Sequence, residues 1–179
     1  LLSYAKEPIV SLDPIYAKAD YYLQVTRRTD QATGKITIAE RPGYATLAEQ
    51  IKGLPDRVVL ADVGIFDGDT MREIYKLLKN RQIEVSEIYL GVCNGKSYPK
   101  LNSDIEITVA SGTFNFKEWI ELRDLVGIDG RIVDCETDGQ RRFIPYWENL
   151  GQWASIPEKS INPVREICLS YNERIMSML

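Results

Sequence analysis

The sequence predicts an α/β domain with a mostly parallel sheet flanked by helices, and one stretch of the chain carries the main indications. Residues 58–61 form a continuous apolar run, which is typical of a strand covered on both faces of a parallel sheet. An acid and a glycine-containing loop follow this run. The next apolar residues recur at the spacing of one buried helix face: Met71, Ile74, Tyr75 and Leu78.

Residues 57–71 therefore read as a buried strand, a seven-residue loop and the first turn of a helix. The strand ends in Asp62, and Gly68 lies in the loop just before the helix. Free amides and the helix dipole favour an anion at a helix start, so this turn is a usual place for an α/β domain to hold a phosphate. We take the turn as the centre of the predicted functional site.

Several further segments have the composition of β-strands, with β-branched and aromatic residues bounded by proline, glycine or asparagine. The turn chemistry of residues 29–34 joins two of these strands into a hairpin flap with an exposed tip. Pro8 and Pro14 restrict the first strand to a short extended piece. In chain order the predicted strands are residues 9–12, 21–27, 35–40, 58–61, 87–93, 105–110 and 131–135.

Helical spacing predicts the remaining elements. Residues 44–51 form a short helix with Gly53 as its C-terminal cap, and residues 116–125 have helical spacing. An aromatic, irregular segment over 143–153 precedes a last helix, which Asn162 caps and Pro163 opens. The apolar residues that share one face of this helix are Val164, Ile167, Tyr171, Ile175 and Met178.

The composition is that of a globular domain. With 179 residues and 44% hydrophobic content, we expect one domain over 1–179, with a core at 19–135 and a C-terminal aromatic segment and helix at 136–179. The net charge of −4 argues against general nucleic-acid binding and against membrane-surface binding, since both need a basic field. Because the chain begins at Leu1 rather than methionine, a fragment lacking its N-terminal part is left open.

Cysteine and histidine usage narrows the chemistry. The three cysteines, Cys93, Cys135 and Cys168, have no metal-like spacing and each lies in an apolar run, which favours buried thiols in a reducing, cytoplasmic setting. No apolar run approaches the ~18 residues of a membrane span. The sequence contains no histidine, so catalysis would have to use carboxylates, lysine, tyrosine or a bound metal.

Residues 58–71, VVLADVGIFDGDTM, resemble the phosphoribosyl pyrophosphate (PRPP) signature of type I phosphoribosyltransferases. Residues 19–40, ADYYLQVTRRTDQATGKITIAE, are similar to the strand and flexible hairpin of the hypoxanthine-guanine-type members. The resemblance covers roughly residues 19–95. It implies a type I phosphoribosyltransferase-like fold and a ligand such as PRPP or a nucleotide, with Mg²⁺ carried on the pyrophosphate.

The resemblance also implies roles for single residues. Asp62 matches the first of two acids that contact the ribose hydroxyls, whereas Gly68 and Thr70 match the loop that cradles the 5′-phosphate. Asn94 falls near a lysine that contacts the purine in hypoxanthine-guanine-type enzymes, and Lys96 would take that place after a small shift in register.

Four residues of this stretch differ in chemical type from the family pattern. Val63 stands at the second acid, and Phe66 replaces an acid that serves near N7 of a purine, so we expect activity on ordinary purines to be absent or weak. Asp67 and Asp69 occupy loop positions that are normally neutral or basic. A carboxylate ~4 Å from a phosphate costs about 1 kcal/mol in water and about 4 kcal/mol at an effective dielectric of 20, so the pair opposes phosphate binding unless a cation intervenes.

Two alternatives use the same acids. Asp67, Asp69 and Thr70 are favoured helix-capping residues, and a carboxylate there would satisfy the amides that a phosphate would otherwise receive. The chain would then be a catalytically inactive module for binding or assembly, with a second copy or another domain of the same protein as its partner. Alternatively, Asp62, Asp67 and Asp69 are oxygen ligands for Mg²⁺ or Ca²⁺ in a metal-dependent phosphohydrolase.

Overall fold

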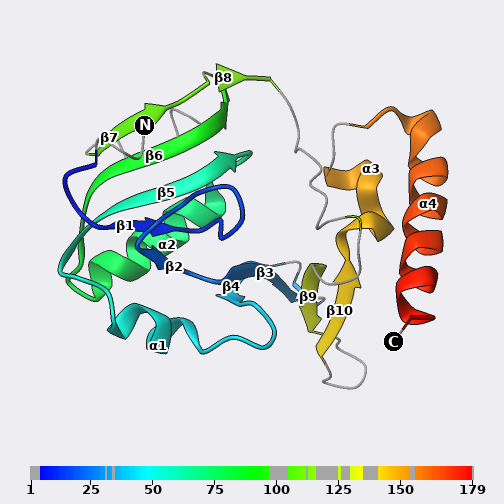
Figure 1. The fold of residues 1–179 in the computed structure, drawn as a ribbon, viewed down its shortest axis with the longest axis horizontal. Coiled ribbons are helices and arrows are strands. Elements are labelled where there is room, and N and C mark those ends of the chain that lie inside the picture. Colours follow the sequence, from blue (N-terminus) through cyan, green and yellow to red (C-terminus); the bar gives the residue numbers. More distant parts are fainter. Residues whose placement is uncertain are drawn as a thin grey trace. The chain divides into compact units, whose positions relative to one another are not determined.

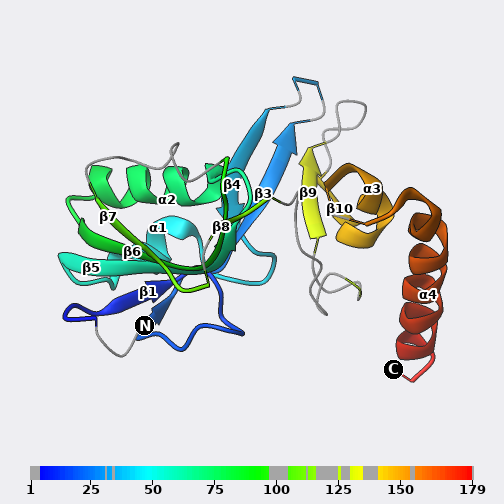
Figure 2. The same cartoon turned by 90° about the horizontal axis from the view of Figure 1, so that it is seen from above.

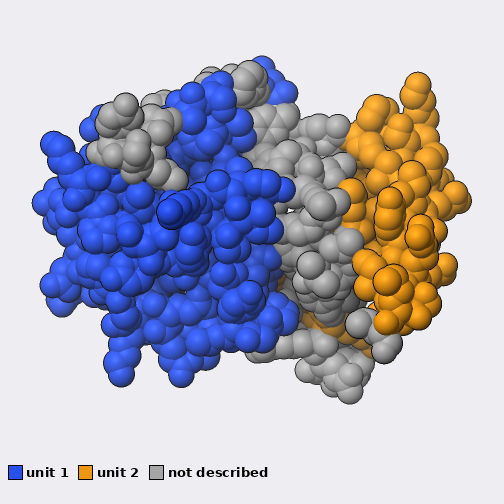
Figure 3. Space-filling model, in the orientation of Figure 1, with its two compact units in different colours: residues 1–26, 38–115 blue, residues 27–37, 116–179 orange. Residues whose placement is uncertain are grey.

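The computed structural model describes residues 5–30, 32–33, 35–96, 105–111, 113–115, 125, 130–134, 141–153 and 156–178. The chain divides into two compact units, coloured blue and orange in Figure 3. Unit 1 comprises residues 1–26 and 38–115, and unit 2 comprises residues 27–37 and 116–179. Each unit has its own cluster of buried apolar side chains.

Unit 1 is built on a parallel sheet (Figure 1). Its strands are β1 (Ile9–Ser11), β2 (Tyr21–Tyr22), β5 (Arg57–Ile65), β6 (Glu84–Asn94), β7 (Glu106–Val109) and β8 (Thr113–Phe114). They lie in the order β2-β1-β5-β6-β7, with β8 also paired to β6, and every pair is parallel. The predicted parallel sheet is thus confirmed, as are the strands expected around residues 9–12, 58–61, 87–93 and 105–110.

Helix α2 (Asp69–Asn80) covers one face of this sheet (Figure 2). Met71, Ile74 and Leu78 are each fully buried, so the predicted helical stripe does face the core. They belong to one cluster with apolar residues of β5 and β6, among them Leu60 and Leu90. Burial on both faces explains the continuous apolar run of β5, because its successive side chains point to opposite sides. On the other face, Ile9, Val59, Ala61 and Tyr89 form a second cluster.

Helix α1 (Leu47–Lys52) starts at a capping box. The Glu49 amide donates to Thr46 Oγ1 at 3.3 Å, and the Thr46 amide donates to Glu49 Oε2 at 3.0 Å. These reciprocal bonds satisfy two donors that a helix start otherwise leaves without partners. The helix ends at Gly53, as predicted, and Ile51 contributes its side chain to the core beneath α2.

A second, four-stranded sheet has the order β10-β9-β3-β4. Its strands are β3 (Val25–Asp30), β4 (Ile36–Glu40), β9 (Gly130–Asp134) and β10 (Arg141–Pro145). The predicted hairpin is confirmed, because β3 and β4 are neighbours and the Asp30 amide donates to the Lys35 carbonyl at 2.9 Å. At the tip, Asp30 Oδ1 accepts a bond from the Thr33 amide at 2.9 Å, which lowers the pKa of the Asp30 carboxyl.

The C-terminal part of unit 2 is helical. A 3-10 turn η4 (Tyr146–Asn149), helix α3 (Leu150–Trp153) and helix α4 (Glu158–Met176) pack around Trp147, Leu150 and Cys168. Arg165 of α4 donates two bonds of 3.0 Å to the Glu148 carboxylate. The segment expected to be irregular therefore contains regular elements, β10, η4 and α3, and that expectation was wrong.

Two predicted elements also need correction. The strand expected at 21–27 is two strands, β2 and β3, which belong to different sheets. Between them, the amide of buried Leu23 donates to the Ser11 carbonyl and the Gln24 amide donates to the Gln50 side chain at 2.7 Å. The last helix begins at Glu158, with Pro157 as its N-cap. Pro163 therefore lies inside the helix rather than at its first position, and Asn162 is not its cap.

Some expectations concern segments that are only partly covered. The helix expected at 116–125 lies outside the described residues except for Leu125, and so does Cys135. Cys93 and Cys168 are free and buried, as predicted. Among the helices of the described chain, none combines the length and the apolar composition needed to cross a bilayer.

Candidate functional site

The candidate site lies at the carboxyl edge of the parallel sheet. Strand β1 pairs with β5 through Val10 and Leu60, and β5 pairs with β6 through Ile65 and Cys93. Because these strands are parallel, the segments that follow them emerge at the same edge. The chain runs outward from β1 to β2 on one side and from β5 to β6 on the other, so the direction of winding reverses between β1 and β5. In open α/β sheets such a reversal marks the crevice where ligands bind.

The turn between β5 and α2 is tighter than the sequence indicated. Strand β5 continues to Ile65, because its last residues pair with β6 up to Cys93. Only Phe66, Asp67 and Gly68 separate it from α2, so the expected seven-residue loop was wrong. Asp62 consequently lies within β5, opposite Leu90, and not at the strand end.

Gly68 makes this short turn possible. Its φ of +78° lies in the left-handed region, which residues with a Cβ rarely adopt, and it is the N-cap residue of α2. The preceding Asp67 accepts a bond of 2.9 Å from the Asp69 amide through Oδ1. A carboxylate of the protein thus receives one of the amides that a helix start offers to an anion, as the self-capping interpretation proposed.

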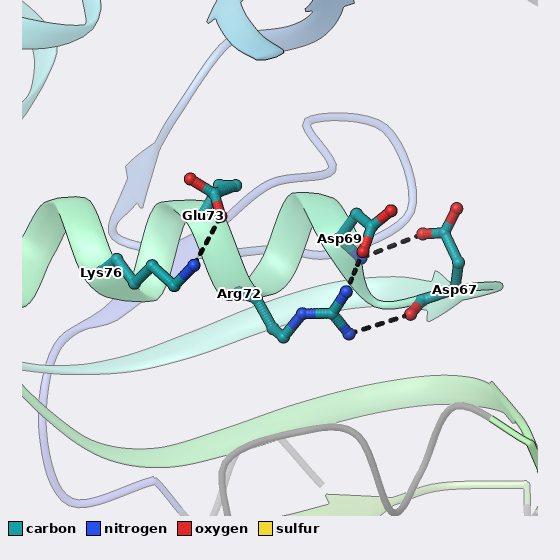
Figure 4. A network of polar contacts seen from close by, with 5 residues as sticks. All are labelled: Asp67, Asp69, Arg72, Glu73 and Lys76. Carbon is teal, nitrogen blue, oxygen red and sulfur yellow. Dashed lines mark hydrogen bonds and ion pairs between the residues drawn. The ribbon is translucent and has the colours of Figure 1, made fainter. Parts of the chain in front are cut away.

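Arg72 completes the turn (Figure 4). Its guanidinium pairs with the Asp69 carboxylate through Nη2 and donates to the Asp67 carbonyl through Nη1 at 3.2 Å. Of the two acids that opposed phosphate binding, Asp69 is therefore paired with a cation, and Asp67 bonds to the same cation through its backbone carbonyl. Sequence reasoning missed Arg72, although an acid and an arginine three residues apart in the first turn of a helix are spaced to pair.

A second pair of the same spacing lies one turn farther along α2 (Figure 4). Lys76 Nζ donates to Glu73 Oε1 at 2.8 Å, and both side chains are more than half exposed. Neither residue bonds to the β5–α2 turn in the described structure. Substituting Arg72 removes a cation at the turn, whereas substituting Lys76 removes only an ion pair on the helix surface.

Asn94 lies at the end of β6, and Cys93 precedes it. Asn94 is 4% exposed, and its Oδ1 accepts a bond of 2.9 Å from the amide of Lys96. The side chain that the resemblance assigned to base contact thus also shapes the turn that leaves β6. Burial raises the pKa of the Cys93 thiol, which keeps this neighbour protonated and unreactive.

The segment after β1 is a part of the edge that sequence reasoning did not single out. Asp13 is 1% exposed, and its Oδ1 accepts bonds from the amides of Ile15 and Tyr16 at 2.7 and 2.6 Å. Ser11 Oγ accepts from the Asp13 amide and donates to the Asp13 carbonyl. The Asp-Pro pair at 13–14 was the available signal, since such pairs initiate turns.

The remaining predicted residues have mixed surroundings. Phe66, Asp67 and Thr70 are partly buried, whereas Asp69 is exposed. Asp62 is partly buried, and its Oδ1 accepts a bond of 2.8 Å from the amide of Val63. Within the described ranges no three acidic or cysteine side chains are grouped so that they could hold a metal ion.

Comparisons of the chain with known protein families, with characterised proteins and with solved structures gave no match.

Proposed function

We propose that the chain is a divergent, type I phosphoribosyltransferase-like domain that binds a phosphoribosyl or nucleotide ligand at the carboxyl edge of its parallel sheet. The observation that carries the proposal is the reversal of winding between β1 and β5, with the β5–α2 turn directly beside it. This is the position at which an open α/β sheet offers a ligand crevice. The sequence pattern of residues 58–71 supports the same location.

In this proposal the roles follow the resemblance, with one addition from the geometry. Asp62 accepts hydrogen bonds from the ribose hydroxyls, and Gly68 and Thr70 receive the 5′-phosphate at the start of α2. Arg72 adds a cation beside that phosphate, which offsets one of the two acids of the turn. Anion binding at a helix start is stabilised by free amides and by the helix dipole.

If the domain is catalytic, the reaction is transfer of a phosphoribosyl group to a nitrogenous base. A bond forms between the base nitrogen and the anomeric carbon, and the bond from that carbon to pyrophosphate breaks. Mg²⁺ would enter on the pyrophosphate, since the described acids do not group into a metal site of their own. Phe66 cannot accept a proton, so turnover of hypoxanthine or guanine is expected to be weak or absent.

The second candidate is a catalytically inactive module with the same scaffold, acting on a partner copy or another domain in the cytoplasm. The internal bonding of the β5–α2 turn favours it. Asp67 already receives the Asp69 amide, and Asp69 already pairs with Arg72, so both acids of the turn have partners within the chain. Val63 in place of a second acid points in the same direction.

Calorimetric titration with PRPP and with nucleoside monophosphates, each with and without Mg²⁺, separates the two candidates. We expect saturable binding to the unmodified chain, weakened at least tenfold by Arg72→Ala and by Thr70→Ala. Lys76→Ala is the matched control, because it removes a basic residue paired three positions back on the same helix. Equal binding by the Arg72 and Lys76 variants would place the ligand elsewhere, and the absence of heat with every ligand would favour the module.

A further inference from the structure

One peptide of β5 departs from the ladder that joins β5 to β6. The register pairs Asp62 with Leu90 and Gly64 with Val92, and it skips Val63 and Gly91 between them. The Val63 amide donates to Oδ1 of Asp62 at 2.8 Å. The backbone at Val63 therefore holds the carboxylate of the preceding residue.

Gly91 provides the space for this departure. A Cβ added to Gly91 would lie 2.3 Å from the Val63 carbonyl oxygen and 3.3 Å from its carbonyl carbon. Carbon and carbonyl oxygen atoms of neighbouring strands normally stay about 3.3 Å or more apart. The obstructing atoms are backbone, so any larger residue at position 91 would require a strand to move.

On the side away from β5, Gly91 is held in place by Ser111. Its carbonyl oxygen accepts a bond from the Ser111 amide at 3.0 Å and another from Ser111 Oγ at 2.5 Å. These two bonds oppose a retreat of β6. A side chain at position 91 would consequently displace the Val63 carbonyl and, through the rest of the Val63 backbone, the amide that bonds Asp62.

We propose that Gly91 is a positioning residue for the ligand site, acting on Asp62 through the backbone of Val63. By leaving room for the Val63 carbonyl, it lets the Val63 amide hold the Asp62 carboxylate in one orientation. A carboxylate that is already oriented loses less side-chain freedom when ribose hydroxyls bind to it. This inference rests on the proposed function, because that proposal gives Asp62 its ligand.

The matched test compares Gly91→Ala with Gly53→Ala, since a Cβ at Gly53 meets nothing within 4 Å. Calorimetry with PRPP and Mg²⁺ should show at least tenfold weaker binding for Gly91→Ala and less than a twofold change for Gly53→Ala. Ser111→Ala keeps the glycine and removes one of the two bonds to its carbonyl. It should weaken binding by about two- to fivefold, and it serves if Gly91→Ala does not fold.

A second readout follows the Asp62–Val63 bond without any ligand. In proton–nitrogen correlation spectra, the Val63 amide of the unmodified chain should shift as the Asp62 carboxylate titrates. Gly91→Ala should abolish this response, Ser111→Ala should reduce it, and Gly53→Ala should retain it. A merely structural role of Gly91 would leave the response intact in any variant that folds.

The outcomes are distinguishable. Wild-type affinity in a folded Gly91→Ala variant, or weakened affinity with an unchanged Val63 response, overturns the positioning role. Failure of the unmodified chain to bind PRPP or any nucleotide overturns the proposed function instead, and Gly91 then has no ligand site to position. Loss of affinity together with loss of the Val63 response supports both.

Discussion

Helices α2 and α4 carry similar apolar stripes in the sequence, yet the structure buries the first stripe and leaves most of the second exposed. Met71, Ile74 and Leu78 of α2 are completely buried. On α4, Ile167 and Tyr171 are 55% and 57% exposed. Periodicity thus predicted both helices, but only for α2 did it also predict the buried face.

The difference follows from what each helix packs against. Helix α2 connects the parallel neighbours β5 and β6, and such a crossover must return across the sheet, which brings its apolar side onto the sheet face. Helix α4 instead packs around Trp147 and Leu150. Its inward side is built from buried Cys168 and from Asn172, whose Nδ2 donates to the carbonyls of Cys168 and Leu125 at 2.7 and 3.3 Å.

The largest expected effect tests this contrast directly. Leu78→Ala in α2 should lower the free energy of unfolding by about 2–5 kcal/mol, because it removes a fully buried side chain and leaves a cavity. Ile167→Ala in α4 should change it by less than about 0.5 kcal/mol, as is usual for exposed positions. Urea unfolding followed by circular dichroism measures both. A loss of similar size at Ile167 would mean that the α4 stripe is covered in solution.

The next effect concerns where α4 begins. Pro163 lies inside the helix, where its missing N–H leaves out one hydrogen bond of the helix. Pro163→Ala should therefore stabilise α4 by up to about 3 kcal/mol. Asn162→Ala is the comparison. It should cost nothing if the helix begins at Glu158, but about 1 kcal/mol if Asn162 is the cap that the sequence suggested. Thermal melting and helical circular dichroism of the two variants would decide between the two starts.

Helix α1 offers a start that depends on local chemistry alone. Thr46→Ala removes the side-chain half of the capping box and should cost about 1 kcal/mol in urea unfolding. Thr46→Ser keeps the hydroxyl and should retain most of the stability. An equal loss in the serine variant would show that the threonine methyl group, rather than the cap, stabilises the start of α1.

The smallest effect is the pH response of the same cap. Hydrogen bonds from the Thr46 side chain and amide hold the pKa of the Glu49 carboxyl below its ordinary value of 4.5. A lowered folded pKa means that the ionised form stabilises the fold above pH 4.5, and that this contribution is lost as the pH falls through the folded pKa. Carboxyl titration by nuclear magnetic resonance should show that Thr46→Ala raises the Glu49 pKa toward its ordinary value, because the side-chain bond is lost and only the amide bond remains, whereas an unchanged pKa would rule out the side-chain bond as a cause.

The site shows the same division between local and distant information. Asp67, Asp69 and Thr70 were expected to cap a helix start. The structure places the start there, with Gly68 as the N-cap residue and with Asp67 accepting the Asp69 amide, and both features depend on a few neighbouring residues. The extent of β5 was misjudged, since three of its last four residues pair with β6. Arg72 and Asp13 were missed although their bonds are to residues a few positions away, and only the strand order shows that both lie at the same edge of the sheet.

By itself the sequence determined the local elements of this protein: the apolar strand β5, the buried stripe of α2, the hairpin of β3 and β4, and the Gly53 cap. Each of these depends on residues a few positions apart, where backbone preference and side-chain spacing act directly. Only the tertiary structure decided the strand order, the reversal of winding between β1 and β5, and the exposure of the α4 stripe. It also decided the approach of Gly91 to the Val63 carbonyl, because pairing partners are chosen by burial and hydrogen bonding between residues far apart in the chain.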